Sequence, residues 1–377
     1  MITIKKMAEL LGTSTTTVSN VIHGKTGEVS PAMVEKVQQL LLEYDYVPNI
    51  NARNLARNKS GIIGLAMKAC RDKYENFIKD PFAGELTGAV ESCVRAGGYF
   101  TMLYISDDIT EIISSVASWN VDGLILHGMQ AEDGAKITEK IKKPMVFIDC
   151  YLEETVPDYV NVGSQDRKGC YDITRYLIGH GHERIAFLAD NRFGVDFERL
   201  KGFQDALREA GILYTEEHFI MLQPNGDDLS KTLDDVYKKV GDFTAFVCAS
   251  DYYAAHILND LKDRGVKIPE DISIVGFDDN VYSQIVRPAL TTVHQDVTEK
   301  GSLAVDKLLQ MIQQEEIGER IIRLPVEIVE RDSVKKEREC MCKQHAFPFF
   351  FCHFLQVAFC GEKRKRNCCH GDYKVLI

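Results

Sequence analysis

Residues 12–24, with the sequence GTSTTTVSNVIHG, are rich in hydroxyl groups and contain no charged side chain. Ser14 is a good N-cap for a helix that would bury Val18 and Val21 and end at Gly24. Short hydroxyl side chains can hydrogen-bond to base edges in the major groove of DNA, where carboxylates do not fit the pattern of donors and acceptors. The stretch therefore predicts a recognition helix.

Two further helical patterns flank this stretch. Residues 3–11 carry apolar side chains at helical spacing and are followed by the stop signal Gly12. Pro31 opens the third pattern. The inner face of that third helix would carry Val34, Val37, Leu41 and Tyr44. Three short helices, the first two joined by a turn that contains glycine, predict a helix-turn-helix in residues 1–47; the alternative is an ordinary three-helix bundle.

The next segment, residues 48–60, has no acidic side chain, and Arg53 and Arg57 supply positive charge. It is too short to be a stable helix in isolation, so we expect it to fold against a phosphate backbone and a partner chain. Leu55 is apolar within this basic run, which favours a wedge between base steps in a minor groove, although ordinary linker packing is the alternative. The segment is interpreted as a hinge helix and linker.

The middle of the chain alternates short apolar runs with amphipathic helical stretches. The runs lie at residues 61–67, 99–106, 121–128, 144–150, 184–189, 244–250 and 272–279. Strands that alternate with helices indicate an α/β fold in which parallel sheets have helices on both faces. We expect residues 61–332 to form two such lobes with a cleft between them, and ligands to bind beyond the carboxyl ends of the strands.

Composition restricts the class of protein. The formal net charge is -11, and the hydrophobic and charged fractions of 45% and 27% are ordinary for a globular protein. No apolar run is long enough to cross a membrane, and the N-terminus lacks a signal-peptide pattern, so we expect a cytoplasmic protein. Residues 1–60 hold seven basic and five acidic side chains, whereas residues 61–332 are acidic. A basic head on an acidic body is typical of a DNA-binding module joined to a sensor domain.

Catalytic and metal-binding patterns are weak. His180 and His182 suggest a metal pair, but no cluster of acidic or histidine residues accompanies them, and the end of a helix explains them better. Residues 24–26 resemble the end of a phosphate loop that lacks its leading glycine. The adjacent carboxylates of Asp278 and Asp279 have no partner base. We expect no catalytic residue, no metal and no cofactor.

The stretches IKKMAELLGTSTTTVSNVIHG (4–24), VSPAMVEKVQQLLLEYDYVPN (29–49) and ARNLARNKSGIIGL (52–65) resemble the DNA-binding head and hinge of the lactose-repressor (LacI) family of bacterial transcription regulators. The resemblance implies DNA contacts from Thr15, Thr16, Thr17, Asn20, Asn49, Arg53, Leu55 and Arg57. Asn20 departs from the arginine frequently found in the family, so the operator sequence cannot be carried over.

The resemblance extends over residues 1–332 and includes a sugar-sensing core that shares its fold with periplasmic sugar-binding proteins. It implies a polar clamp on an effector and three further contacts. The clamp would be Asp149, Arg199 and Asp278, and the further contacts would be Phe82, Ser250 and Gln295. Carboxylates and a guanidinium can each engage two adjacent hydroxyls, as a polyol ligand requires. The alternatives are structural: ion pairs or helix caps for the charged residues and plain core for Phe82.

The function expected from this resemblance is that of a repressor that binds a near-palindromic, double-stranded DNA operator as a homodimer. A small-molecule effector, a sugar or sugar derivative, would change the angle between the lobes and so move the paired hinges. One alternative is a regulator controlled by a protein corepressor. Another, of a different class, is a sugar-binding protein without a DNA-directed function.

The last residues, 333–377, are rich in cysteine, with six of the eleven in the chain. A cytosolic chain rarely uses cysteines for disulfides, which leaves zinc ligands or free thiols. The spacing of Cys340 and Cys342 does not fit the usual zinc pattern. We expect an unstructured or aberrant extension.

Overall fold

The structure is a computed structural model that describes residues 2–46, 59–69, 76–152, 156, 159–223 and 226–336. The predicted hinge contacts lie outside these residues, namely Asn49, Arg53, Leu55 and Arg57. The expectation for the tail lies outside them as well from residue 337 onward.

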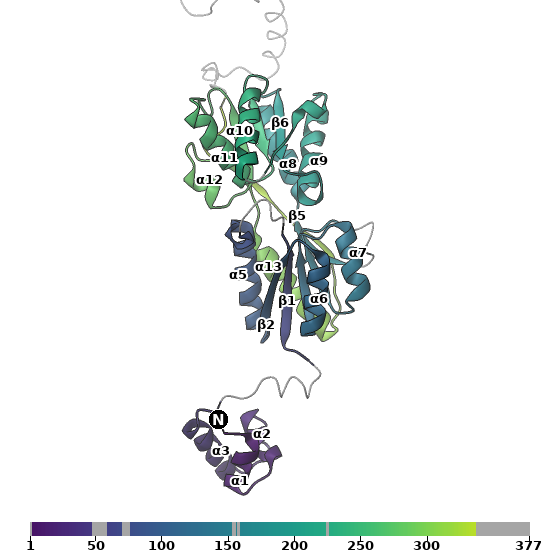
Figure 1. Cartoon of the computed structure of the whole chain (residues 1–377), viewed down its shortest axis with the longest axis vertical. Helices are drawn as coiled ribbons and strands as arrows, with labels where there is room; N and C mark the ends of the chain where they lie inside the picture. The colour runs from purple at the N-terminus through teal and green to yellow at the C-terminus, as the bar shows by residue number, and fades with distance from the viewer. Residues whose placement is uncertain are drawn as a thin grey trace, which may run out of the picture. The chain divides into compact units, whose positions relative to one another are not determined.

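The head consists of the three expected helices, α1 (Ile4–Leu11), α2 (Thr15–Ile22) and α3 (Pro31–Glu43), which lie side by side in Figure 1 and share a small core. The Ser14 hydroxyl caps α2 by accepting a 3.0 Å hydrogen bond from the backbone N–H of Thr17. Val18, Val21 and Val37 are buried together. These contacts confirm the caps and the apolar faces of the helix-turn-helix.

Tyr44 is the exception in the head. It was expected on the inner face of the third helix, but it caps the C-terminus of α3 and is 44% exposed. The next residue, Asp45, has a φ of 42°, and Tyr46 instead packs against the core of the head. Because α3 ends at Glu43, Tyr44 lies outside the helix and does not continue its apolar face.

Lobe 1 is a six-stranded sheet with strand order β11-β5-β4-β3-β1-β2. Its strands are β1 (Ile62–Lys68), β2 (Phe100–Ser106), β3 (Gly123–His127), β4 (Met145–Ile148), β5 (Val160–Ser164) and β11 (Ile321–Leu324). Helices α5 (Pro81–Ala96) and α13 (Val297–Gln313) bury their apolar sides on one face of the sheet. Helices α6 (Ile109–Trp119) and α7 (Ala131–Lys140) cover the other, as Figure 1 also shows.

Lobe 2 repeats this architecture with the strand order β12-β10-β9-β8-β6-β7. Its strands are β6 (Ile185–Ala189), β7 (Phe219–Met221), β8 (Ala245–Cys248), β9 (Ser273–Asp278), β10 (Thr291–His294) and β12 (Glu327–Val329). Helices α8 (Asp166–Gly179) and α9 (Gly194–Glu209) pack on one face. The core of the other face includes side chains of α10 (Gly226–Lys239) and α11 (Asp251–Asp263), next to α12 (Val281–Ile285). The expected fold class is confirmed.

The chain passes between the lobes three times: after β5, after β10 and between β11 and β12. Every strand pair in the described residues is parallel except β10 with β12, which is antiparallel. The last segment also extends the folded core beyond its expected end at residue 332. Ser333 is buried, its hydroxyl donates to the carbonyl of Ile274 at 2.5 Å, and Val334 is buried in lobe 2. No helix among the described residues is long and apolar enough to cross a membrane.

Candidate functional site

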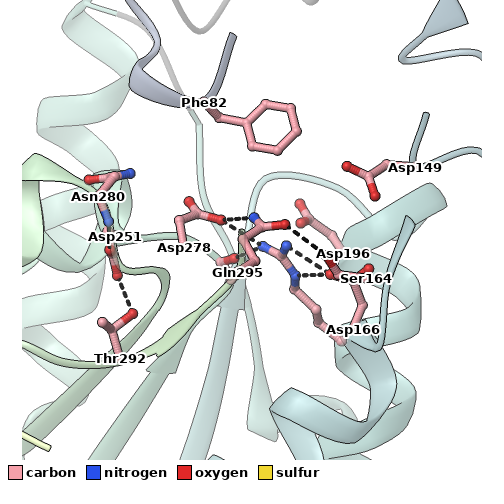
Figure 2. Close-up of polar contacts among 12 residues, drawn as sticks. Phe82, Asp149, Ser164, Asp166, Asp196, Asp251, Asp278, Asn280, Thr292 and Gln295 are labelled. Atoms are coloured by element: carbon pink, nitrogen blue, oxygen red, sulfur yellow. Dashed lines mark hydrogen bonds and ion pairs between the residues drawn. The ribbon is translucent and has the colours of Figure 1, made fainter. Parts of the chain in front are cut away.

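Five of the six predicted effector residues follow strands or lie beside their carboxyl ends. Asp149 follows β4, Asp278 ends β9, Gln295 follows β10 and Ser250 follows β8. Arg199 reaches the same edge of lobe 2 from α9, since it donates to the carbonyl of Ala249, just after β8. The sixth residue, Phe82, is in the first turn of α5, and Figure 2 shows it facing the same region as Asp149, Asp278 and Gln295.

Arg199 is buried and makes several polar contacts within lobe 2. It pairs with Asp166 at 2.8 Å, lies 3.6 Å from Asp278, and donates to the Ala249 carbonyl at 2.6 Å. Its guanidinium also stacks 3.6 Å from the centre of the Phe277 ring. Burial opposes the charged form, but the carboxylates of Asp166 and Asp278 outweigh it and raise the pKa of Arg199. The guanidinium is therefore a fixed positive charge at the end of this sheet.

The two clamp aspartates both have a positive backbone φ. Asp149 has a φ of 53° and Asp278 a φ of 119°, both in the region that favours glycine. Asp279, with a φ of 58°, continues the turn and pairs with Arg331 at 2.5 Å. Backbone strain of this kind costs about 1–3 kcal/mol per residue and gathers at ligand sites. Asp149 thus lies directly after β4, and Asp278 is the last residue of β9.

A buried carboxylate behind Asp278 supports this turn. Asp251 accepts hydrogen bonds from the backbone N–H of Asn280 at 3.0 Å and from the Thr292 hydroxyl at 2.6 Å. Burial, and next the charge of Asp278, raise the pKa of Asp251 well above its ordinary value. Asp251 therefore holds the loop after β9 against β10, and Figure 2 shows its contact with Thr292.

Gln295 joins the two lobes. Its amide nitrogen donates to Asp278 of lobe 2 at 2.7 Å, and its amide oxygen accepts from Ser164 of lobe 1 at 3.1 Å. The same oxygen accepts a 2.8 Å hydrogen bond from Lys300. Lys300 also binds both carboxylate oxygens of Asp149, at 2.8 and 2.7 Å. Asp149, Gln295, Asp278 and Arg199 are thus brought into one network of polar contacts.

Two polar atoms at these strand ends have no hydrogen-bond partner among the described residues. The Ser250 side chain is only 9% exposed, and its hydroxyl does not cap α11 although Ser250 stands at the N-cap position. In lobe 1, Nδ1 of His127, at the end of β3, is also without a partner, and the ring lies 5.2 Å from that of Phe82. Burial lowers the pKa of His127, which favours the neutral imidazole. Because an unpartnered buried polar group is costly, both atoms are candidates for ligand contacts.

Three further residues of this candidate site were not predicted from the sequence: Asp166, Lys300 and His127. Asp166 is the first residue of α8, and Lys300 lies on the buried side of α13. His127 is a polar residue that ends an apolar run, and this is the one signal in the sequence that could have identified it. The contacts of Asp166 and Lys300 are made across 33 and 151 residues of chain, which no local pattern records.

The predicted recognition helix presents its threonines unequally. Thr15 and Thr16 are exposed, whereas Thr17 and Asn20 are half-buried. The Thr17 hydroxyl lies 2.9 Å from that of Ser14, so it takes part in the cap of α2. The helix has no charged residue along its length. It therefore offers a neutral surface of donors and acceptors to a partner.

The two histidines considered as a metal pair have structural partners. His180 caps the C-terminus of α8, and its ring bonds the carbonyl of Tyr176 at 2.8 Å. The His182 ring lies between the hydroxyls of Thr244 and Ser273, each at 3.0 Å. This confirms their interpretation as the end of a helix. In the part of the chain that is described, no group of three or more potential ligands could hold a metal ion.

Comparison with known families and proteins agrees with this architecture. The family described as "Bacterial regulatory proteins, lacI family" matches residues 3–49, and a periplasmic binding protein-like domain matches residues 174–334. The HTH-type transcriptional repressor PurR of Vibrio atlanticus (strain LGP32) is 33% identical over 344 residues, which cover 89% of this chain and 99% of that protein. The HTH-type transcriptional regulator GalR of Escherichia coli (strain K12) is 30% identical over 344 residues, or 89% and 96% of the two chains.

Solved structures show the same likeness. The Lac repressor dimer bound to operator and the anti-inducer ONPF superposes with a TM-score of 0.76 at 25% identity, covering 88% of this chain and 98% of that one. The complex of the transcriptional regulator CelR with cellobiose gives a TM-score of 0.67 at 25% identity, covering 88% and 100%. Relatives of this architecture match the chain along almost their whole length, and they are transcription regulators and not enzymes. The chain therefore belongs to the lacI family of bacterial regulatory proteins and is a DNA-binding transcription regulator, not an enzyme.

Proposed function

We propose that the protein is a cytoplasmic repressor that binds a near-palindromic operator as a homodimer and responds to a sugar or sugar derivative. The named repressors among its relatives support repression, and the operator-bound Lac repressor dimer supports a dimer on DNA. Bound cellobiose and ribose in related regulators support a sugar effector. The domain boundaries that go with this proposal are a head at 1–47, a hinge and linker at 48–60 and an effector core from residue 61.

The effector site lies at the carboxyl ends of the strands, with contacts from Phe82, Asp149, Arg199, Ser250, Asp278 and Gln295. The observation that carries this proposal is the Ser250 hydroxyl, buried without a partner beside the Arg199 contact to Ala249. A ligand hydroxyl would satisfy it, while Asp278 and Arg199 accept from and donate to neighbouring hydroxyls. Phe82 would cover the apolar face of a sugar ring.

On DNA, Thr15, Thr16, Thr17 and Asn20 would contact the major groove. The exposed hydroxyls of Thr15 and Thr16 support this role. The hinge contacts proposed for Asn49, Arg53, Leu55 and Arg57 rest on the family resemblance and on the basic composition of the segment. An effector that binds one lobe arrangement better than the other would shift operator affinity.

The test is a thermal-shift screen of the full chain against neutral sugars, sugar phosphates and nucleobases. A ligand at 100 times its Kd should stabilise the folded protein by about 2.7 kcal/mol. We expect a sugar to raise Tm and the Arg199→Met variant to lose that rise. Arg208→Met, in the exposed part of the same helix, is the matched control and should keep it. If no metabolite stabilises the folded protein, the sugar effector is wrong and a protein corepressor becomes the candidate.

A further inference from the structure

Lys300 is the only fully buried lysine among the described residues, with no exposed surface. It extends from the N-terminal part of α13 and donates to both oxygens of Asp149 and to the amide oxygen of Gln295, at 2.7–2.8 Å. Its ammonium also lies 5.2 Å from the centre of the Phe82 ring. The lysine therefore touches three of the residues proposed to hold the effector.

Stability alone does not account for a charge in this position. Burying an ammonium and a carboxylate costs desolvation that their attraction offsets only partly, and an apolar pair of similar volume is often as stable. An ammonium has three N–H donors, and here three acceptors take them. Lys300 thus has no donor left for a ligand, and it acts on binding through the residues that it contacts, first of all Asp149 and Gln295.

Its effect on Gln295 is to set the orientation of the amide group. The ammonium and the Ser164 hydroxyl both donate to the amide oxygen, which leaves the nitrogen facing Asp278. Its effect on Asp149 is to neutralise the carboxylate, while each oxygen keeps a lone pair that can accept from a hydroxyl. Without the ammonium, lobe 1 would present an uncompensated negative charge to the ligand.

We propose that Lys300 is a positioning residue that determines effector specificity: by neutralising Asp149 and orienting Gln295, it makes the site select an uncharged, hydroxyl-bearing ligand over a cationic one. The inference rests on the proposed effector site and adds the charge class of its ligand. It assigns the selection to a residue that does not itself bind the ligand.

The test compares Lys300→Met with the wild type by calorimetric titration of full-length protein. The probes are glucose with glucosamine and galactose with galactosamine, at a pH below the pKa of the sugar amine. In Lys300→Met the exposed charge of Asp149 should attract the amine, and affinity for the amino sugars relative to the neutral sugars should rise roughly tenfold or more, as expected for a charge-assisted hydrogen bond.

Two control variants separate this role from a structural one. Lys300→Arg keeps the positive charge and should keep the wild-type preference, whereas the double variant Lys300→Met/Asp149→Asn should lose the gain in amino-sugar binding. Asp149→Asn alone leaves the buried ammonium without its carboxylate. That variant should gain affinity for the acidic sugar galacturonate relative to galactose.

The possible outcomes are distinct. A folded Lys300→Met protein with the wild-type ratio of affinities overturns the proposal, and so does an equal gain in the double variant. If Lys300→Met does not fold, the galacturonate preference of Asp149→Asn decides, and its absence overturns the proposal. If the wild type binds no neutral sugar, the proposed sugar effector fails, but a gain of amino-sugar binding on loss of Lys300 still measures its control of charge.

Discussion

Gly202 of α9 lies against the backbone of Arg167 in α8 so closely that a Cβ atom at position 202 would be 2.0 Å from the Arg167 carbonyl oxygen. Three residues earlier in α9, Arg199 pairs with Asp166, the first residue of α8. The close approach of the helices and the ion pair occur within one turn of each other. The absence of a side chain at Gly202 therefore lets α9 approach α8 closely enough for Arg199 to pair with Asp166 at the ends of the strands.

Replacing Gly202 with alanine should force α9 away from α8. Because the obstructing atoms are backbone and cannot rotate aside, the free energy of unfolding should fall by about 3 kcal/mol, the upper end of ordinary overpacking. Urea unfolding measures this loss. The matched control is Gly88→Ala in α5, where a Cβ would meet no atom within 4 Å and helix propensity should raise stability by up to about 1 kcal/mol. Equal effects of the two substitutions would contradict the packing argument.

His182 should make the stability of the protein depend on pH. Burial, and next the nearby charges of His180 and Lys335, lower the pKa of His182 to about 4. An unfolded histidine has a pKa of about 6.5, so the unfolded chain takes up a proton at this residue before the folded one does. Above about pH 6.5 His182 is neutral in both states, so its protonation does not affect stability. As the pH falls from 6.5 toward 4, the free energy of unfolding should decrease by up to about 3 kcal/mol.

Urea unfolding between pH 7.5 and 4.5 checks this contribution. His182→Gln retains a donor and an acceptor for Thr244 and Ser273, and its unfolding free energy should decline less on acidification than that of the wild type. His180→Gln removes one of the charges that lower the pKa of His182, so its unfolding free energy should decline less than that of the wild type but more than that of His182→Gln. Parallel pH curves for the wild type and His182→Gln would show that this histidine is not the source.

The head allows the folding of the recognition helix to be separated from base recognition. Ser14→Ala removes the cap of α2 and should cost about 1 kcal/mol of stability, weakening binding to all DNA sequences alike. Thr16→Ala, at an exposed position, should leave the head folded and relax preference at one base pair by about 1–3 kcal/mol. The measurement is binding to an operator selected from random duplexes and to its single-base variants. A uniform loss with Thr16→Ala would remove Thr16 from the base contacts.

The sequence predicted the elements whose signals are local. The caps of α1 and α2 and the apolar runs that became β1, β2, β3, β4, β6, β8 and β9 could be located without a structure, because capping and burial act over a few residues. The pattern of apolar runs did not predict β7 and β12, which have only three residues each. It did not predict β10 either, because this strand contains the polar residues Thr291, Thr292 and His294. Their place in the sheet is fixed by neighbouring strands.

The sequence supplied the residues of the candidate site but not the network of contacts that joins them. The resemblance named Asp149 and Gln295, while Lys300, which binds both, looks like one more lysine on an amphipathic helix. Its burial follows from the way α13 returns to lobe 1 after β10 of lobe 2, and a crossing of this kind has no local signature. Residues that act through other residues are the part that sequence reasoning cannot supply.

Asp122 attaches the C-terminal end of the linker to lobe 1. It precedes β3, and its two carboxylate oxygens accept hydrogen bonds from the backbone N–H groups of Ser60, at 2.9 Å, and Gly61, at 2.8 Å. Ser60 is the last residue of the segment assigned to the hinge and linker, and these contacts lie at the amino ends of the strands, opposite the effector site. Asp122 therefore fixes the point at which the linker enters the core.

Asp122→Ala should loosen this attachment, and since a hydrogen bond to a charged group contributes about 1.5–3 kcal/mol, operator affinity should fall roughly tenfold. The Kd of the effector should stay unchanged, because no residue of that site contacts Asp122 in the described part of the chain. Asp108→Ala is the matched control: it removes a carboxylate that accepts a backbone N–H at the start of α6, in the same lobe but away from the linker. The test is to titrate both variants with operator and, separately, with effector. An equal loss of operator affinity in the two variants would show that the effect is a general destabilisation of lobe 1.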